Sequence, residues 1–168
     1  MFQDEARFGR LPVIRAAWAP PGVRPVVKAA IEREFRYIYA AVSPFEGNLH
    51  WMVADSMRTS TMGLFLRQIA ETYPDEYILM VTDGASSHTS GDLRIPDNMA
   101  ILRLPPYSPE LNPAEGIWDH AREKACANVF FDKLDHVTER VVEELHRLAQ
   151  STSRVVDMFL HPWLIEST

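Results

Sequence analysis

The sequence is most distinctive between residues 103 and 118, which read Arg103-Leu-Pro-Pro-Tyr-Ser-Pro-Glu-Leu-Asn-Pro-Ala-Glu-Gly-Ile-Trp118. The prolines within residues 105–109 remove backbone donors and keep the residues before them extended, so no helix can run through them. The four residues 112–115 are then typical of a helix start, with Asn at the N-cap, Pro at the first helical position and Glu three residues after the cap. An extended arm therefore places Glu115 in the first turn of a helix. On local grounds alone, Glu115 could be a capping-box glutamate and nothing more.

Length and composition favour one globular domain. The chain has 168 residues, 46% of them hydrophobic, which is enough for a full core. Its longest aliphatic and aromatic run, Tyr77 to Val81, is far too short to span a bilayer, and the charges between Met1 and Arg10 do not fit a signal peptide. A single cysteine, Cys126, excludes an internal disulfide and a thiolate metal site. These features predict a protein of the reducing cytoplasm with no membrane partner.

The charge is unevenly distributed along the chain. The net charge of −6 argues against a general nucleic-acid binder held by a basic surface. Residues 1–36 nevertheless carry seven Lys and Arg against four Asp and Glu, whereas residues 37–168 carry ten against nineteen. Only the first fifth of the chain is therefore expected to attract phosphates.

The hydrophobic pattern predicts an α/β fold. Strands are expected at residues 1–8, 34–42, 49–54, 77–82 and 99–104, with 77–82 in the centre of the sheet because it is apolar on both faces. Residues 9–25, rich in Pro and Gly, are expected to form a loop or distorted hairpin that projects from the body. An amphipathic helix, capped near Thr59 or Ser60, separates the third and fourth strands, and the chain is mostly helical after Trp118. We therefore expect one domain with a five-stranded mixed sheet flanked by helices.

Three acidic residues fall near the ends of these elements. Asp4 lies in the first strand, Asp83 closes the fourth, and Glu115 opens a helix. Asp4 and Asp83 can meet if their strands are neighbours, since adjacent strands run about 4.8 Å apart. Ligands that are all oxygen suit hard cations such as Mg²⁺ or Mn²⁺, and two such ions can support an in-line phosphoryl displacement.

Three segments carry a resemblance to a known family: Phe2-Gln-Asp-Glu-Ala-Arg-Phe8, Val81-Thr-Asp-Gly-Ala-Ser-Ser-His88 and Leu104-Pro-Pro-Tyr-Ser-Pro-Glu-Leu-Asn-Pro-Ala-Glu-Gly-Ile-Trp118. They resemble the three motifs of the DDE transposases, specifically the bacterial insertion-sequence branch of the mariner superfamily. The third motif is long and specific, and the resemblance covers nearly the whole chain as an RNase H-like catalytic domain. It implies that Asp4, Asp83 and Glu115 form a triad that binds two Mg²⁺ or Mn²⁺ ions. It also implies metal-dependent hydrolysis at transposon ends, strand transfer into target DNA, and a homodimer in the active complex.

The sequence departs from the family pattern at three points. Only 31 residues separate Asp83 from Glu115, which is shorter than usual for the family, and Gly84 stands where Asn is commoner. Full-length relatives carry a helix-turn-helix DNA-binding domain upstream of the first strand, so residues 1–168 are expected to be a catalytic domain without that domain. Two other functions therefore stay open: a non-catalytic partner that inhibits a full-length transposase, and a general RNase H-like nuclease.

Several other residues are candidates for binding DNA. His88 is part of the second motif and could hold a phosphate or a water, although a loop His that caps a helix is an equal alternative. Trp18, flanked by Arg15 and Arg24, could stack or wedge against DNA, or it could fold onto the sheet. The cations expected to contact phosphates are Arg10, Arg15, Arg24 and Lys28. Asp119, one turn after Glu115, is a stand-in carboxylate or a solvated helix residue, and the apolar stripe from Leu134 is core or a dimer seam.

Overall fold

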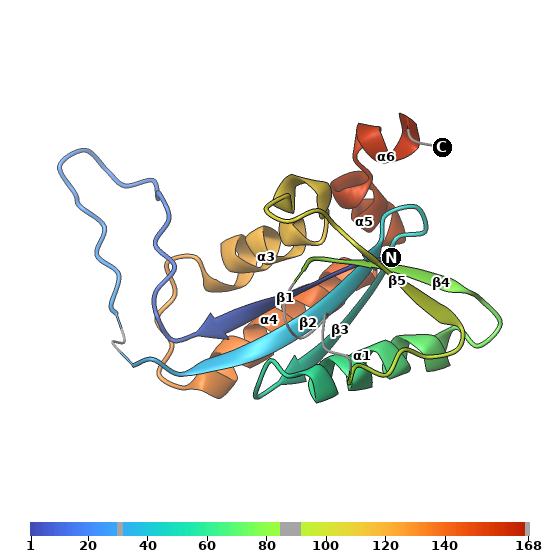
Figure 1. The fold of residues 1–168 in the computed structure, drawn as a ribbon. Helices are drawn as coiled ribbons and strands as arrows, with labels where there is room; N and C mark the ends of the chain where they lie inside the picture. The colour runs from blue at the N-terminus through green and yellow to red at the C-terminus, as the bar shows by residue number, and fades with distance from the viewer. Residues whose placement is uncertain (30–31, 85–91, 167–168) are drawn as a thin grey trace.

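Five strands form one mixed sheet in the part of the chain that the computed structural model describes, which is residues 1–29, 32–84 and 92–166. The order across the sheet is β3-β2-β1-β4-β5 (Figure 1). The antiparallel strands β1, β2 and β3 are followed by β4, parallel to β1, and β5, parallel to β4. The strand bounds are β1 (Phe2–Gly9), β2 (Phe35–Ser43), β3 (Asn48–Ala54), β4 (Ile78–Thr82) and β5 (Met99–Arg103). The five predicted strands are thus confirmed.

The predicted place of the fourth strand in the sheet is wrong. The middle strand is β1, and β4 lies next to the edge strand β5. Leu79 of β4 and Leu102 of β5 are each 51% exposed, whereas Val81, on the same face of β4 as Leu79, is buried in the core cluster that contains Phe2 and Phe8 of β1. A continuous apolar run thus does not require full cover on both faces here, because one face of β4 is only partly covered.

The helix that covers this half is α1 (Thr59–Thr72), which packs below the sheet in Figure 1. Its buried residues, Met62, Phe65, Leu66, Ile69 and Ala70, follow the predicted helical stripe and form one core cluster with β2, β4 and β5. The predicted cap is wrong: Arg58 is the N-cap residue, and no side chain makes a cap hydrogen bond. Thr59 and Ser60 lie inside the first turn instead.

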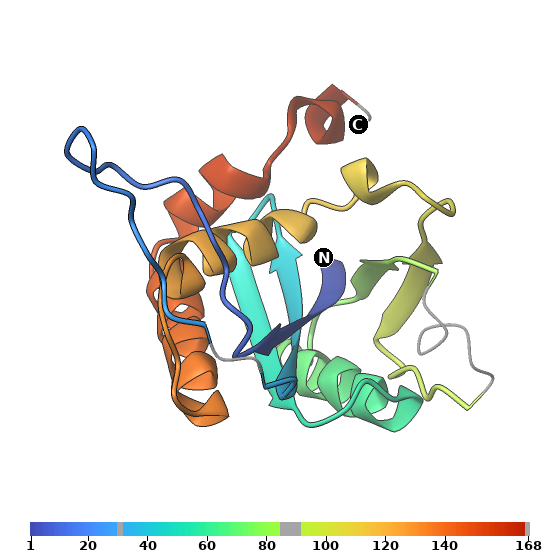
Figure 2. The ribbon, with the colours of Figure 1, turned by 90° about the vertical axis from the view of Figure 1, so that its left-hand side faces the viewer.

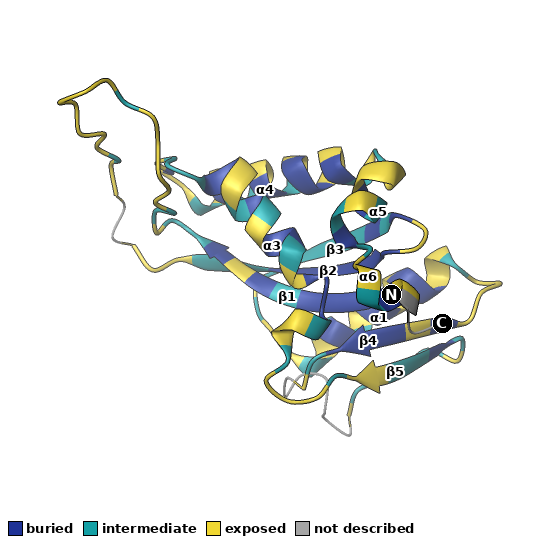
Figure 3. Cartoon of the chain, turned by 90° about the horizontal axis from the view of Figure 1, so that it is seen from above, coloured by how far each residue is buried: buried dark blue, intermediate teal, exposed yellow. Residues whose placement is uncertain are grey.

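The remaining helices cover the opposite face of the sheet (Figures 1 and 3). They are the short 3₁₀ turn η1 (Pro109–Leu111), α3 (Glu115–Ala121), the π-helical turn η2 (Arg122–Cys126), α4 (Leu134–Ala149), α5 (Thr152–Phe159) and α6 (Pro162–Glu166). The stripe along α4 is buried in the chain's own core, with Val137, Val141, Leu145 and Leu148 fully inaccessible, so it is not a dimer seam. The single cysteine, Cys126, is buried in the same core. None of the helices among the described residues is long and apolar enough to cross a membrane.

Candidate active site

Asp4 lies three residues into the middle strand, on the face of the sheet that carries α3. Its carboxyl Oδ2 accepts a 2.7 Å hydrogen bond from the indole Nε1 of Trp118. Both side chains are buried, with 6% of Asp4 and 1% of Trp118 exposed. Since a buried carboxyl oxygen requires donors, the Trp118 N–H sets the orientation of the Asp4 side chain.

Asp83 stands level with Asp4, just beyond the end of β4. The parallel pairing of Phe2 with Val81 sets this register, and two residues further along each strand are Asp4 and Asp83. The two strands are neighbours, which is the condition under which the sequence allows Asp4 and Asp83 to meet. The Asp83 side chain is partly buried.

The start of α3 differs in detail from the expected helix cap. The Oδ1 atom of Asn112 accepts a 3.2 Å hydrogen bond from the Ala114 backbone N–H, so Asn112 does cap this turn. The N–H groups of residues 115–117 donate to the carbonyls three residues earlier, so a tight turn precedes α3, which begins at Glu115 rather than at Pro113. The Asn112 N–H donates to the Pro109 carbonyl at 2.9 Å. A capping-box role for Glu115 is therefore not needed, because the donor that it would satisfy already has an acceptor.

Asn112 also ties this turn to the strand that carries Asp4. Its Nδ2 atom donates a 3.1 Å hydrogen bond to the backbone carbonyl of Gln3, and the Asn112 side chain is 4% exposed. One amide thus holds the beginning of α3 against β1, beside Asp4. The proline-rich segment 104–109, called the proline arm below, acts together with Asn112 and Trp118 to fix Glu115 and Asp4 relative to each other.

Asp83 and Glu115 line one open cavity of about 370 Å³. The proline arm forms much of its wall, and the lining residues are Asp83, Gly84, Leu104, Pro105, Pro106, Tyr107, Ser108, Pro109, Asn112 and Glu115. Most residues of the proline arm are exposed, and Tyr107 takes a positive φ of 59°. The cavity is open to a large substrate and leads to the carboxylates.

The three acidic residues influence each other electrostatically. Burial, and next the charge of Glu115, raise the pKa of Asp4 to about 7. The pKa of Glu115 is also raised, chiefly by burial and further by Asp119 and Asp83, while Arg122 opposes the shift. The repulsion thus runs from Asp4 through Glu115 to Asp83, as is expected of closely placed carboxylates.

The donors in this network fit a hard divalent cation. All three are carboxylates, which are the ligands that Mg²⁺ and Mn²⁺ prefer, and a cation between them would relieve their mutual repulsion. Among residues 1–29, 32–84 and 92–166, no three His, Cys, Asp or Glu side chains stand close enough together to form a complete metal-binding group. Asp4 instead turns one oxygen to Trp118.

Residues 11–29, which lie between β1 and β2 in the sequence, project as a long arm away from the sheet and its helices (Figures 1 and 2). Trp18 lies on this arm and is fully exposed, at 105% of the reference value, so the alternative that it folds onto the sheet is wrong. Arg24 and Lys28 are exposed as well. These side chains are therefore available to a partner, as the DNA-binding prediction requires.

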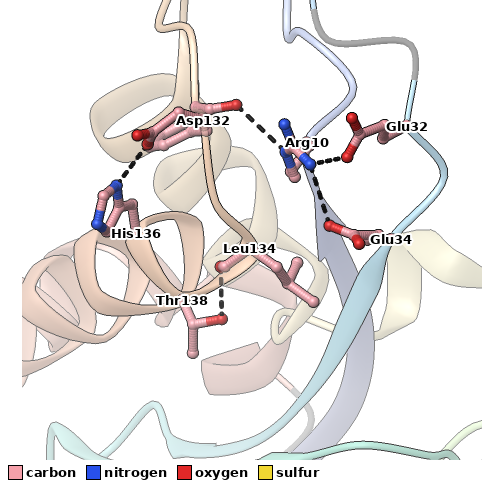
Figure 4. A network of polar contacts seen from close by, with 8 residues as sticks. Arg10, Glu32, Glu34, Asp132, Leu134, His136 and Thr138 are labelled. Carbon is pink, nitrogen blue, oxygen red and sulfur yellow. Dashed lines mark hydrogen bonds and ion pairs between the residues drawn. The ribbon is translucent and has the colours of Figure 1, made fainter.

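Two of the predicted DNA-binding arginines are instead engaged at the base of the arm. Arg10 forms ion pairs with Glu32 and with Glu34, the latter at 3.2 Å, and its Nε donates to the Phe131 carbonyl (Figure 4). Only 11% of the Arg10 side chain is exposed, so the prediction that it contacts phosphates is wrong. Arg15 forms a 3.3 Å ion pair with Glu123 and stays 46% exposed.

Of the two remaining candidates, one lies outside the described residues. That residue is His88, the predicted phosphate or water ligand. Asp119 is 82% exposed and 3.9 Å from Arg122, so it is a solvated residue on the rim of the site. The hydrogen bonds of Trp118 and Asn112 to β1 were not foreseen, because the partners are 114 and 109 residues apart in the sequence.

One comparison with known proteins shows the family, and a second finds a curated relative. A family model described as DDE superfamily endonuclease matches residues 1–138. A curated relative, "Uncharacterized protein y4pE/y4sA" from Sinorhizobium fredii (strain NBRC 101917 / NGR234), is 29% identical over 128 residues, which is 76% of this chain and 95% of the relative.

Solved structures of a transposase share the fold. The Mos1 transposase paired-end complex with left transposon end matches with a TM-score of 0.59 and 16% identity, covering 93% of this chain. The Mos1 mariner paired end complex with Mn matches with a TM-score of 0.60 and 16% identity over the same share. This chain spans about half, 54%, of the Mos1 chain in each.

The mixed sheet with helices on both faces is therefore the RNase H-like fold of these structures. The family match reaches from the strand that carries Asp4 through the helix that begins with Glu115, and on into α4. The chain belongs to the DDE superfamily endonucleases.

Proposed function

We propose that this chain is the catalytic domain of a transposase, which hydrolyses phosphodiester bonds at transposon ends. The freed 3′-hydroxyl then attacks a phosphodiester of the target DNA, forming a new P–O bond while the 3′ oxygen of the target strand leaves. The observation that carries the proposal is the electrostatic coupling of buried Asp4 to Glu115 and of Glu115 to Asp83, the last two of which line one open cavity. Within this group Glu115 raises the pKa of Asp4, and Asp83 raises the pKa of Glu115, while Arg122 opposes the second shift. The family match and the Mos1 complexes with transposon ends support DNA as the substrate.

Each residue of the site has a distinct part in this proposal. Asp4, Asp83 and Glu115 would hold two Mg²⁺ or Mn²⁺ ions, which when bound activate the attacking oxygen and stabilise the leaving oxygen of an in-line displacement. Trp118 orients the Asp4 carboxyl through its 2.7 Å hydrogen bond. Asn112 fixes the start of α3 on β1, so that Glu115 stays beside Asp4.

The arm supplies contacts to DNA beyond the cavity. Trp18 offers an exposed aromatic face for stacking, and Arg24 and Lys28 offer exposed charges for phosphates, with a partial contribution from Arg15. In the active complex two copies of the chain would act together, one for each transposon end.

Thermal unfolding with divalent cations tests the metal site. An ion that binds only the folded state stabilises it by about 2.7 kcal/mol at a hundredfold excess over its Kd. Mg²⁺ or Mn²⁺ should raise the melting temperature of the wild type but not of Asp83→Ala. The matched control is Asp119→Ala, which removes an exposed carboxylate one turn from Glu115 and should keep the gain. An equal rise in all three proteins would indicate unspecific surface binding and reject the site.

Nicking of supercoiled plasmid DNA tests the activity. Wild type and Asp119→Ala should convert the plasmid to the open circle when Mn²⁺ is present, and Asp83→Ala should not. A chain that binds the cation but never nicks DNA would instead support the non-catalytic partner.

A further inference from the structure

A second cavity, on the α1 side of the sheet, is rich in hydrogen-bond donors. It measures about 370 Å³ and lies between the first three turns of α1 and residues 92–94. Its lining residues are Thr59, Ser60, Gly63, Leu64, Arg67, Asp92 and Arg94. Four of these seven, two arginines and two hydroxyl residues, carry donors in their side chains.

None of these four side chains has an acceptor among the described residues. In the described ranges, the side chains of Arg67, Arg94, Thr59 and Ser60 make no hydrogen bond or ion pair. By contrast, Arg10, Arg15, Arg36, Arg122 and Arg147 each have a carboxylate partner. Asp92 is the one acid in the lining, and it already interacts with another group. The cavity is therefore a cationic site in a chain whose net charge is −6.

Gly63 lines this cavity and places no side chain in it. A glycine inside a helix costs about 0.5–1 kcal/mol relative to alanine, so its presence needs a reason. Packing does not supply that reason, because a Cβ at Gly63 would meet only Leu93 Cδ1, at 4.0 Å. Close approach of a ligand to the helix backbone does supply it.

We propose that this cavity binds a phosphate of the DNA backbone. Guanidinium groups match the geometry of phosphate oxygens, and serine and threonine hydroxyls are common phosphate donors in protein–DNA interfaces. The site is distinct from the carboxylate cavity, which lies on the α3 side, but Asp92 follows Asp83 by only nine residues, at the far end of one connection. The cavity would hold the DNA backbone on the α1 side of the sheet, while the carboxylates act on the α3 side. The inference rests on the proposed function in that it takes DNA as the substrate.

Duplex binding by two matched double variants tests the proposal. Arg67→Ala/Arg94→Ala removes the pair in the cavity, and Arg140→Ala/Arg154→Ala removes two exposed arginines from α4 and α5 with the same change in charge. Fluorescence anisotropy with a labelled duplex is measured in EDTA from 50 to 200 mM KCl. We expect the cavity variant to bind about tenfold more weakly, with a log–log salt slope smaller by about one. The control should stay within about twofold of the wild type.

A third variant separates binding from stability. Ser60→Asp places a carboxylate in the cavity and also in the first turn of α1, which now has no acidic residue. An acidic residue at that position favours the helix. We therefore expect unchanged or higher thermal stability together with weaker duplex binding.

Three results would overturn the proposal. Equal salt slopes for the two double variants would mean that the cavity arginines act only through net charge. If the wild type bound no duplex at all, DNA could not be the ligand of the cavity. Stabilisation of the wild type by 10 mM inorganic phosphate, lost in the cavity variant while duplex binding is unchanged, would make the cavity a small-anion site. Plasmid nicking is scored separately, so normal nicking with equal slopes rejects the cavity alone and leaves the transposase proposal standing.

Discussion

At the scale of single residues, the indole of Trp118 is a direct hydrogen-bond partner of a proposed catalytic side chain. It donates to Asp4 from a fully buried position in α3. Trp118→Phe keeps most of the ring but removes this hydrogen bond, and hydrogen bonds to charged groups contribute about 1.5–3 kcal/mol. We expect a loss of that size at pH 8 by urea denaturation, together with weaker binding of Mn²⁺. Trp51→Phe, a partly buried tryptophan of β3, is the control. A similar loss in both variants would show that only ring packing matters.

The Asp4 carboxyl should also make stability depend on pH when divalent cations are absent. Burial, with Glu115 next, raises its pKa from 3.8 to about 7, so the folded state holds the proton more tightly than the unfolded chain. The stabilising contribution of protonated Asp4 is complete below pH 4 and is lost as the pH rises through 7. The loss is at most about 4 kcal/mol, since one pKa unit corresponds to about 1.4 kcal/mol.

Urea denaturation in EDTA between pH 4 and 8 measures this effect. The wild type should lose stability across the range, Asp4→Asn should show a flatter profile, and Mg²⁺ at pH 8 should restore the wild type. Identical profiles for the two proteins would assign the pH dependence to another group.

The sequence could identify Asp4, Asp83 and Glu115 as candidates, because the motifs name them and local rules place them at the ends of elements. It could not supply the contacts that orient them, since Trp118 and Asn112 reach more than a hundred residues back along the chain. For the same reason Arg10 was assigned to DNA, although Glu32, Glu34 and the Phe131 carbonyl engage it. A charge count along the sequence does not show which cations are already paired.

At the scale of elements, the prediction succeeded where one face is apolar and one polar. The buried positions of α1 and α4 follow their helical stripes, and the strands of the β2–β3 hairpin lie within one residue of their predicted bounds. It failed for β4, because an apolar strand next to an edge strand looks the same in sequence as a central one. It also failed at the start of α1, where two residues suited to capping lie inside the helix and Arg58 is the N-cap.

The turn of the β2–β3 hairpin gives a prediction at this scale. Gly47 has a φ of +73°, and a Cβ there would lie 2.3 Å from the Thr152 carbonyl oxygen at the start of α5. Gly22 has a similar φ of +83° on the arm, with nothing within 4 Å. Both alanine variants carry the backbone strain, but only Gly47→Ala adds a clash, which should cost about 1–3 kcal/mol more. Thermal denaturation of the two variants side by side gives the difference, and equal losses would mean that the hairpin can move away from α5.

At the scale of the whole molecule, the charge distribution limits what this chain can do with DNA unaided. The net charge is −6, and Arg10 and Arg15 at the base of the arm are paired with carboxylates. Exposed cations remain on the arm at Arg24 and Lys28, and in the cavity beside α1. We therefore expect weak binding to duplex DNA that does not depend on sequence and weakens further as salt rises.

Titration of a transposon-end duplex and a scrambled duplex, each at 50 and 150 mM KCl, checks this expectation. The two duplexes should bind equally at either salt concentration. Tight binding that favours the transposon end would mean that these 168 residues read sequence themselves.

The burial of Cys126 makes the molecule convenient for optical work. Cys126 is 4% exposed, and burial raises the pKa of its thiol to about 11. The thiol of the folded chain should therefore not react with maleimide dyes at neutral pH. A cysteine introduced at the exposed Ala17, next to Trp18, would then be the single reactive thiol. A fluorophore attached there could report, one molecule at a time, whether the arm swings or stays still when a duplex arrives.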